Sequence, residues 1–167
     1  MSSENKINIR PATTDDVALV MQFIKGLAEY EKLADEVVAT EANMYESLFG
    51  PNANAEAVFA CHIDSSPQEI GCAVFTQHYS TYSGRSSLYL EDLFVLSEWR
   101  SHGVGHELIA YGAGLAKSRG YPRMEWSVLD WNELAIGFYE KLGATRVEGW
   151  LTYRLSGEAL NRLNPLG

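Results

Sequence analysis

The chain has 167 residues, of which 46% are hydrophobic, and its formal net charge is −9. A chain of this length can bury one core, so we expect a single domain over residues 1–167 with its core between about residues 7 and 155. The acidic balance disfavours binding to nucleic-acid phosphates and favours cationic ligands. We therefore expect no nucleic-acid partner.

No run of about 20 consecutive apolar residues occurs, and the first residues, MSSENK, lack the apolar centre of a signal peptide. We therefore expect a cytoplasmic protein without a membrane partner. Cys61 and Cys72 fall in alternating apolar segments, and their spacing fits neither a disulfide framework nor a metal site. We expect both to be small core residues.

The chain begins with a predicted strand and two predicted helices. Ile7–Arg10 has the pattern of a short strand that a proline ends. Thr13 and Asp16 have the spacing of a capping box, which predicts that a helix starts there. A second helix is expected after Thr40 and should end at Gly50.

Three strands are predicted next. The segments at about Ala57–Ile63 and Ile70–Tyr79 flank a turn and should form an antiparallel hairpin, and after a polar loop Leu88–Val95 should form the third strand. Side chains alternate between the two faces of a strand. The faces predicted for this third strand are Leu88, Leu90, Asp92 and Phe94 on one side and Tyr89, Glu91, Leu93 and Val95 on the other.

Strands and helices alternate in the rest of the chain. Apolar residues at helical spacing after Gly103 predict a helix, which Gly112 and Gly114 should weaken by about 1 kcal/mol each relative to alanine. The remaining expected elements are a strand at Arg123–Leu129, a helix at Asn132–Leu142 and a final strand at about Val147–Leu155. This order predicts an α/β fold with a mixed sheet.

The run Arg100-Ser101-His102-Gly103-Val104-Gly105 is a glycine-rich turn that opens a helix. Helix starts leave backbone N–H groups unpaired, and glycines let a phosphate approach them. A Walker-type loop would need lysine after the last glycine, where the chain has His106, and a dinucleotide fingerprint would need glycine in place of Leu108. A diphosphate carried without a metal fits better, and acyl-CoA is the leading candidate.

This run resembles the pyrophosphate signature of the Gcn5-related N-acetyltransferase superfamily. The wider stretch LYLEDLFVLSEWRSHGVG resembles the diamine acetyltransferase branch, which acts on spermidine, spermine or thialysine. The segments IRPATTDDV, AEYEKLADEV and VLDWNELAIGFYEKLGA extend the resemblance to nearly the whole chain. It implies a mixed sheet whose two central parallel strands splay apart around acetyl-CoA, flanked by helices. It also implies a homodimer, in which the strand at Trp150–Leu155 could lie between subunits. We expect no metal cofactor.

Acetyl transfer needs a neutral amine, yet a lysine-like amine is almost wholly protonated at neutral pH. By resemblance, Glu91 is expected to act as a water-linked base and Asp92 to bind the charge of the substrate, with Glu31 as a further substrate-side carboxylate. Tyr139 is expected to protonate the departing thiolate of CoA. It should lie at the edge of a buried face formed by Leu134, Phe138 and Leu142.

The expected cofactor-binding residues are Phe94, Val95, Arg100, His102, Gly103, Val104, Gly105, His106, Asn132, Tyr139 and Lys141. Arg100 and the loop amides should hold the pyrophosphate, and the backbone of Phe94 and Val95 should bind pantetheine. Asn132 could be a cofactor contact, a helix cap or both. His102 and His106 have the spacing of a metal pair, but no third ligand is evident.

Three functions remain open from the sequence. The first is an acetyl-CoA-dependent N-acetyltransferase in which the primary amine of a small cationic substrate, a thialysine-like or lysine-like amino acid or a polyamine, attacks the thioester directly. The second is a non-catalytic acyl-CoA sensor, which would need neither Tyr139 nor Glu91. The third is a protein-lysine acetyltransferase.

Overall fold

The structure is a computed structural model that describes residues 6–163. Contacts divide the chain into two compact units, Met1–Ser127 and Val128–Gly167. The expected single domain over residues 1–167 stays a prediction. None of the helices in the described part is long and apolar enough to cross a membrane.

The first unit is built on a five-stranded sheet with the strand order β1-β2-β3-β4-β5. The strands are β1 (Ile7–Pro11), β2 (Glu56–His62), β3 (Glu69–Ser80), β4 (Arg85–Val95) and β5 (Met124–Glu125). Strands β1 to β4 pair with one another in antiparallel order, whereas β5 pairs with β4 in parallel. The sheet is therefore mixed, which confirms the predicted α/β class.

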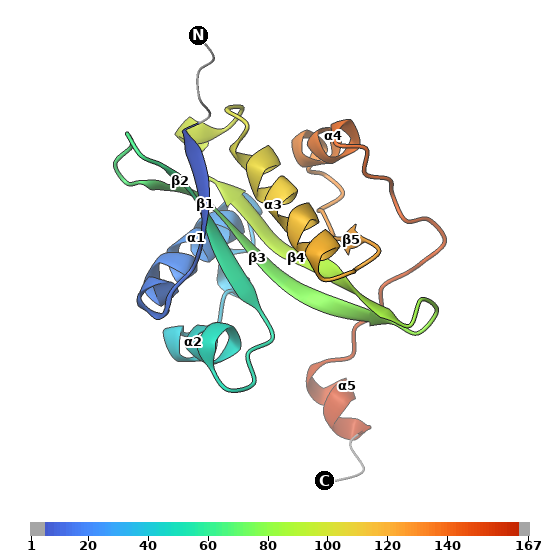
Figure 1. Ribbon diagram of the computed structural model, residues 1–167. Coiled ribbons are helices and arrows are strands. Elements are labelled where there is room, and N and C mark those ends of the chain that lie inside the picture. The colour runs from blue at the N-terminus through green and yellow to red at the C-terminus, as the bar shows by residue number, and fades with distance from the viewer. Residues whose placement is uncertain (1–5, 164–167) are drawn as a thin grey trace. The chain divides into compact units, whose positions relative to one another are not determined.

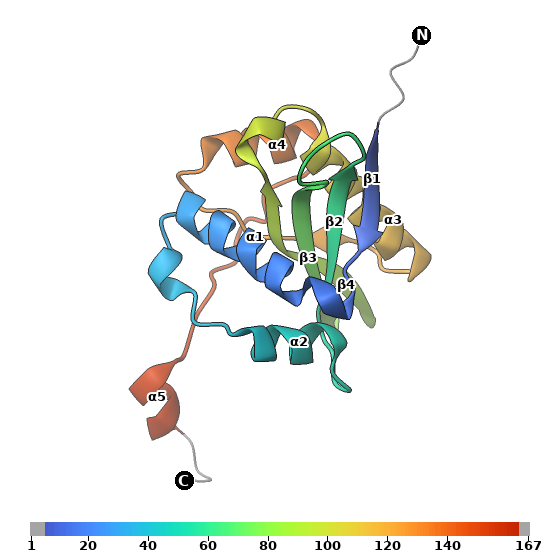
Figure 2. The same ribbon diagram turned by 90° about the vertical axis from the view of Figure 1, so that its left-hand side faces the viewer.

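Helices cover both faces of this sheet (Figure 1, Figure 2). The helices α1 (Val17–Tyr30) and α2 (Glu41–Phe49) lie on one face, and α3 (Val104–Ser118) lies on the other. Short 3-10 turns occur at Thr14–Asp16, Ala34–Glu36 and Ser97–Trp99. The core below α1 and α2 contains Val20, Phe23, Leu48, Phe59, Cys72 and Val74. Cys72 is buried as expected, and Cys61 is half-buried at the margin of this core.

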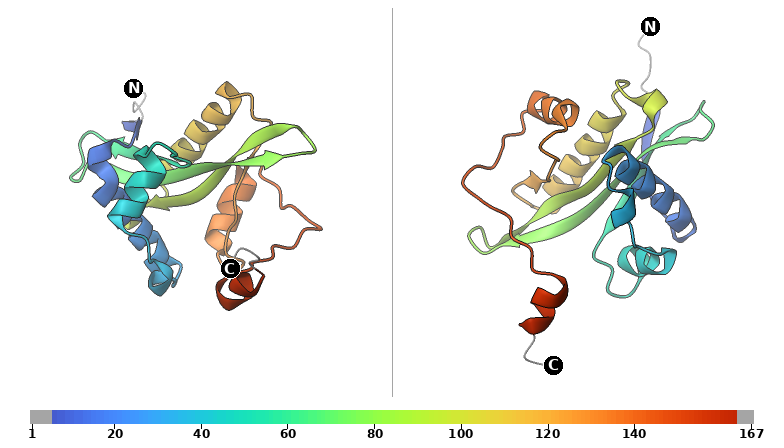
Figure 3. Two further views of the ribbon diagram at one scale, coloured as in Figure 1. Left: turned by 90° about the horizontal axis from the view of Figure 1, so that it is seen from below. Right: turned by 180° about the vertical axis from the view of Figure 1, so that it is seen from behind.

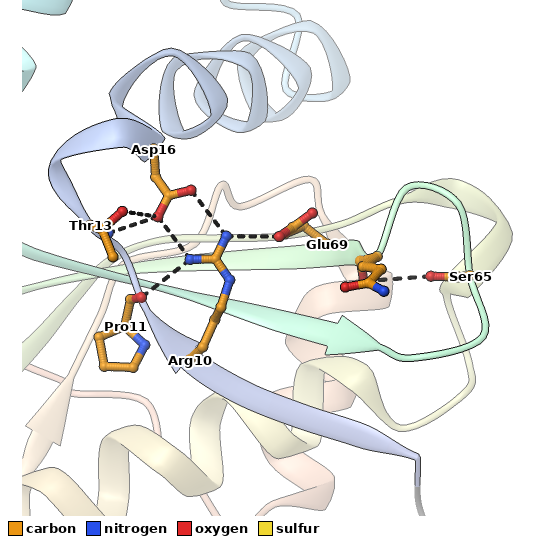
Figure 4. Close-up of polar contacts among 7 residues, drawn as sticks. Arg10, Pro11, Thr13, Asp16, Ser65 and Glu69 are labelled. Carbon is orange, nitrogen blue, oxygen red and sulfur yellow. Dashed lines mark hydrogen bonds and ion pairs between the residues drawn. The ribbon is translucent and has the colours of Figure 1, made fainter.

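The start of α1 is fixed by a polar network around Arg10 (Figure 4). The backbone N–H of Thr13 donates to the Asp16 carboxylate over 2.7 Å, as the capping-box spacing predicted. The Arg10 guanidinium donates to both oxygens of Asp16, over 2.8 and 3.0 Å, and to Glu69 over 2.7 Å. This network ties β1, β3 and the turn before α1 together.

Strand β4 contains a bulge that the sequence did not predict. Leu90 lies opposite Phe75, but Asp92 lies opposite Val74, so Glu91 is an extra residue in β4. Residues that pair across strands point to the same face. Phe75 faces α3, because a Cβ at Gly112 would lie 2.7 Å from its ring, whereas Val74 belongs to the core below α1.

The prediction that Leu90 and Asp92 share a face is therefore wrong. Side chains alternate between the two faces before and after the bulge. Because Glu91 is an extra residue, the side chains after it point to the opposite faces from those predicted. Asp92 and Phe94 face α1, while Leu88 and Leu90 face α3.

The hairpin of β3 and β4 is longer than expected. Strand β4 starts at Arg85 rather than Leu88, and the hairpin extends past α1 and α2 (Figure 3). Strand β5 is shorter than the predicted Arg123–Leu129 because its ladder with β4 contains only two residue pairs, Leu88 with Met124 and Tyr89 with Glu125. Within the described residues, Leu90–Val95 therefore has a strand partner only on its β3 side.

Glycines let α3 approach the sheet closely. A Cβ on Gly112 would lie 2.7 Å from Phe75 and 3.0 Å from Met124. Gly114, two positions further along the same helix, has no atom within 4 Å of its Cβ position. The loss of helix stability expected at Gly112 is therefore the cost of packing α3 closely against the sheet. At Gly114, no contact requires a glycine.

The second unit contains α4 (Glu133–Lys141) and α5 (Gly157–Arg162), of which only α4 was predicted. The predicted strand at Val147–Leu155 is wrong, because no residue of this segment is in regular structure. Its large apolar side chains are exposed, Trp150 by 74% and Tyr153 by 89%. An alternating segment becomes a strand only when it pairs with another strand, and none of the described strands pairs with these residues.

Candidate active site

Three carboxylates from two elements lie close together in the first unit. Asp92 is on the α1 face of β4, Glu91 is the bulge residue beside it, and Glu31 directly follows the last residue of α1. Glu91 is exposed, whereas Asp92 and Glu31 are half-buried. The fold thus brings the three expected substrate-side residues into one group.

The burial and the mutual repulsion of these groups change their acidity. Burial, together with the negative charges of Glu91 and Glu31, raises the pKa of Asp92 to about 6. Burial also raises the pKa of Glu31. A cation that binds beside Asp92 would relieve this repulsion, so the group is suited to an ammonium ion.

The end of α1 is shaped to present Glu31. The Glu31 N–H donates to the Leu27 carbonyl over 2.9 Å, and the next residue, Lys32, has a positive φ of 62° that ends the helix. Further back, α1 lies close to β4, because a Cβ on Gly26 would lie 2.9 Å from the Phe94 ring. This close contact holds the end of α1 near Asp92.

The glycine-rich turn connects β4 to α3 as predicted. Its backbone turns through two residues with positive φ, Ser101 at 63° and Gly103 at 82°. Gly103 is the N-cap of α3, and its carbonyl accepts from the N–H of Glu107 over 3.1 Å. The helix begins at Val104, so the amides of its first turn have no carbonyl partner within the helix and suit an anion.

The Arg100 side chain contacts residues of β4 and α1. Its Nε donates to the Val95 carbonyl over 3.2 Å, and its guanidinium carbon lies 4.9 Å from the centre of the Tyr30 ring and 5.5 Å from that of Phe94. The side chain of the first loop residue therefore reaches the end of α1. Sequence reasoning missed Tyr30, for which the only available signal was its place before Glu31.

The two histidines of the turn are exposed. His102 Nδ1 lies 2.7 Å from the Arg100 carbonyl oxygen, which fixes the fold of the turn. His106 Nδ1 lies 3.7 Å from a carboxylate oxygen of Glu107. In the described part of the chain, no three His, Cys, Asp or Glu side chains are grouped as metal ligands would be.

The other expected site residues lie in the second unit. The Asn132 side chain accepts from the Ala135 N–H over 3.2 Å, which confirms its role as the cap of α4. Tyr139 is half-buried, and its ring centre lies 5.4 Å from that of Phe138. Lys141 is exposed at the end of the helix. Leu134 is 82% exposed, so the expectation that it continues a buried face is wrong.

The chain was compared with known proteins. Residues 25–144 match the acetyltransferase (GNAT) family. Thialysine N-epsilon-acetyltransferase of Sus scrofa is 37% identical over 164 residues, which cover 93% of this chain and 95% of that protein. L-ornithine N5-acetyltransferase NATA1 of Arabidopsis thaliana is 28% identical over 200 residues, which cover 95% of this chain and 88% of that protein.

The fold has solved relatives as well. An integron cassette protein from the mobile metagenome of V. cholerae superposes with a TM-score of 0.76 at 26% identity, covering 95% of this chain and 97% of that protein. The family match, the relative at 37% identity and the solved neighbour agree with one another. The chain belongs to the acetyltransferase (GNAT) family, and its activity is that of an acetyl-CoA-dependent amine N-acetyltransferase.

Proposed function

We propose that the acceptor is a small cationic amine, either a lysine-like or thialysine-like amino acid or a polyamine. The observation that carries this proposal is the half-buried Asp92 beside Glu91 and Glu31, whose charges favour an ammonium ion. The names of the relatives, which act on thialysine and ornithine, support the same class. The net charge of −9 adds a long-range attraction for cations.

The carboxylates have two roles in this proposal. Asp92 binds the ammonium group, and Glu91, which is exposed to solvent, takes the proton that the amine must lose through a water molecule. The neutral amine nitrogen then attacks the thioester carbonyl carbon of acetyl-CoA. The C–N bond forms as the C–S bond breaks, and the CoA thiolate takes a proton from the Tyr139 hydroxyl. The second proton of the attacking nitrogen leaves through water and returns to the Tyr139 oxygen, which yields the neutral amide and CoA thiol.

In this proposal, the turn before α3 binds the cofactor. The amides of Gly103, Val104 and Gly105 bind the pyrophosphate, and the backbone of Phe94 and Val95 binds the pantetheine arm. Arg100, the first residue of the turn, adds a positive charge that attracts the pyrophosphate. Further contacts are proposed from His102, His106, Asn132, Tyr139 and Lys141.

We also propose that the two units form one domain and that the protein is a cytoplasmic homodimer. The exposed apolar side chains of residues 147–155 support the dimer, because a partner subunit could supply the strand edge that this segment lacks. We expect neither a nucleic acid, a membrane nor a metal to take part.

A thiol-release assay tests the proposed function. Acetyl-CoA is offered with thialysine, lysine, ornithine, spermidine, putrescine or a lysine-containing peptide, and release of CoA is followed for each. We expect turnover with the small amines and little with the peptide. Preferred turnover of the peptide would instead support a protein-lysine acetyltransferase.

Two variants separate the enzyme from a sensor. Tyr139→Phe should reduce kcat about 10²-fold or more, as loss of a general acid does, while CoA still binds. Glu140→Gln, at an exposed position of the same helix, serves as a control that keeps Tyr139. Binding of CoA without turnover of any amine by the unmodified protein would support the sensor and contradict the proposal.

A further inference from the structure

Arg100 bridges the two sides of the site, which are otherwise built by different elements. It starts the turn that leads to α3, but its guanidinium lies over the ring of Tyr30 at 4.9 Å and that of Phe94 at 5.5 Å. Its Nε donates to the Val95 carbonyl over 3.2 Å. The side chain thus contacts α1 and β4 at the same time.

The contact with Tyr30 lies next to the carboxylates of the amine side. Tyr30 is the last residue of α1, and Glu31 follows it in the group of carboxylates around Asp92. Tyr30 is 37% exposed, and the helix ends directly after it, just before the positive φ of 62° at Lys32. A cation held over the Tyr30 ring restricts this end of the helix, and Glu31 with it.

The hydrogen bond to Val95 fixes the other end of the bridge. A carbonyl oxygen has two lone pairs, so the Arg100 Nε and an amide of a bound pantetheine arm can share it. The bridge therefore need not open when the cofactor binds. Because the turn can bind an anion through its backbone amides, the side chain of Arg100 is available for this second task.

We propose that Arg100 is a positioning residue for the acceptor amine, which it serves by holding Tyr30 and Glu31 in place through its planar guanidinium. This inference rests on the proposed function, because it assigns the carboxylates to the amine side. It differs from a role as a pyrophosphate ligand, which needs only the positive charge of Arg100. The two roles predict different effects of lysine at this position.

Arg100→Lys keeps the charge but loses the planar group and the Nε donor. We expect the KM for the amine to rise about fivefold, the size of one exposed cation–π contact, while the KM for acetyl-CoA and kcat stay within about twofold. Arg85→Lys, at the exposed start of β4, is the matched control and should change none of these constants. A rise confined to the KM for acetyl-CoA would overturn the proposal in favour of a pyrophosphate ligand.

Variants of Tyr30 test the same bridge from its other end. Tyr30→Leu should raise the KM for the amine as much as Arg100→Lys does, whereas Tyr30→Phe keeps the ring and should restore the original value. Because the two residues act through one contact, the double variant should be no worse than either single variant. If the increases in the KM for the amine multiplied in the double variant, the two residues would act independently and the proposal would be contradicted. An unchanged KM in Tyr30→Leu would contradict it as well.

A binding measurement separates failure of this inference from failure of the proposed function. In the presence of CoA, spermidine or lysine should raise the melting temperature of the unmodified protein, and Arg100→Lys should reduce that shift without reducing the shift caused by CoA alone. An amine shift in the unmodified protein that the variant retains would overturn only the role of Arg100. Absence of any amine shift, together with absence of turnover, would overturn both.

Discussion

Gly26 of α1 lies directly against Phe94 of β4, with 2.9 Å between the position of a Cβ on Gly26 and the nearest atom of the ring. No side chain fits between them unless the helix or the ring moves. The distance of α1 from β4 decides where Glu31 lies relative to Asp92. The absence of a side chain at Gly26 is therefore a requirement of the site as well as of the core.

Gly26→Ala should separate α1 from β4. Overpacking costs about 1–3 kcal/mol, and alanine regains about 1 kcal/mol of helix propensity, so we expect a net loss of unfolding free energy of up to about 2 kcal/mol. The KM for the amine should rise because Glu31 moves with the helix. Urea unfolding and steady-state kinetics measure the two effects.

Gly114→Ala is the control for this change. It also replaces a glycine inside a helix, but nothing lies within 4 Å of its Cβ position. It should raise the unfolding free energy by about 0.5–1 kcal/mol and leave the KM for the amine unchanged. Equal effects of the two substitutions would show that the contact with Phe94 has no influence.

The acidity of Asp92 predicts how amine binding depends on pH. Since burial and the charges of Glu91 and Glu31 raise the pKa of Asp92 to about 6, Asp92 loses its charge below that pH. The KM for the amine should therefore rise as the pH falls from about 7 to 5, while that for acetyl-CoA changes little. Asp92→Asn should raise the KM for the amine at neutral pH and abolish its rise near pH 6, whereas Glu91→Gln should keep that rise.

The same pKa affects stability with a definite sign. The folded chain holds the Asp92 proton more tightly than the unfolded chain, in which an aspartate has a pKa of about 3.9. Asp92 therefore contributes stability that is complete below about pH 4 and is lost as the pH rises through about 6. Replacing it by asparagine should remove this part of the pH dependence in urea unfolding. An unchanged profile would show that Asp92 does not titrate in this range.

The network around Arg10 predicts the opposite dependence on pH. Hydrogen bonds from Arg10 and Thr13 hold the pKa of Asp16 well below its usual range. Its contribution to stability is present above the ordinary pKa of about 4 and is lost as the pH falls toward 2. Asp16→Asn should lower the unfolding free energy by about 1–3 kcal/mol at neutral pH and reduce the loss between about pH 5 and 2.

An exposed ion pair offers a comparison for Asp16. Lys6 and Asp64 also form a salt bridge, but more than half of each side chain is exposed. Exposed pairs contribute little, so Asp64→Asn should leave the unfolding curve nearly unchanged. If both substitutions behaved alike, the burial of the Arg10 network would have no energetic effect.

Gly103 tests the proposed pyrophosphate turn. Its φ of 82° is one that asparagine tolerates and a β-branched residue does not. Gly103→Val should lower both stability and CoA affinity, the latter by about tenfold or more because the amides of the turn lose their alignment, while Gly103→Asn should have a small effect. Isothermal titration with CoA measures the affinity.

Gly120, which follows α3 with a φ of 69°, is the matched control. Gly120→Val should cost similar stability but leave the affinity for CoA unchanged. A turn that binds CoA equally well with valine at position 103 would contradict the proposed pyrophosphate site.

The sequence predicts most element starts because helix caps are local. Thr13 with Asp16 and Thr40 with Asn43 form their hydrogen bonds within four residues, and the structure confirms both helix starts. The glycine-rich turn is local in the same sense. Family resemblance adds the carboxylates on the amine side, and the structure groups them around Asp92.

Features that depend on distant partners could not be predicted in this way. The bulge at Glu91 is fixed by how β4 pairs with β3, which the alternation within β4 does not reveal. The alternating residues 147–155 have the composition of a strand but pair with none of the described strands. The position of the Arg100 side chain depends on a ring from α1, 70 residues earlier in the sequence.

The bulge in β4 makes the position of Asp92 independent of the side chain at position 91. Because Glu91 is an additional residue between two paired ones, the pairing on either side sets the faces of Leu90 and Asp92, whatever side chain occupies position 91. Substitutions at Glu91 can therefore alter proton transfer while Asp92 keeps its place below α1. Selection can then adjust the acid–base properties of this enzyme at one position without rearranging the core on either face of the sheet.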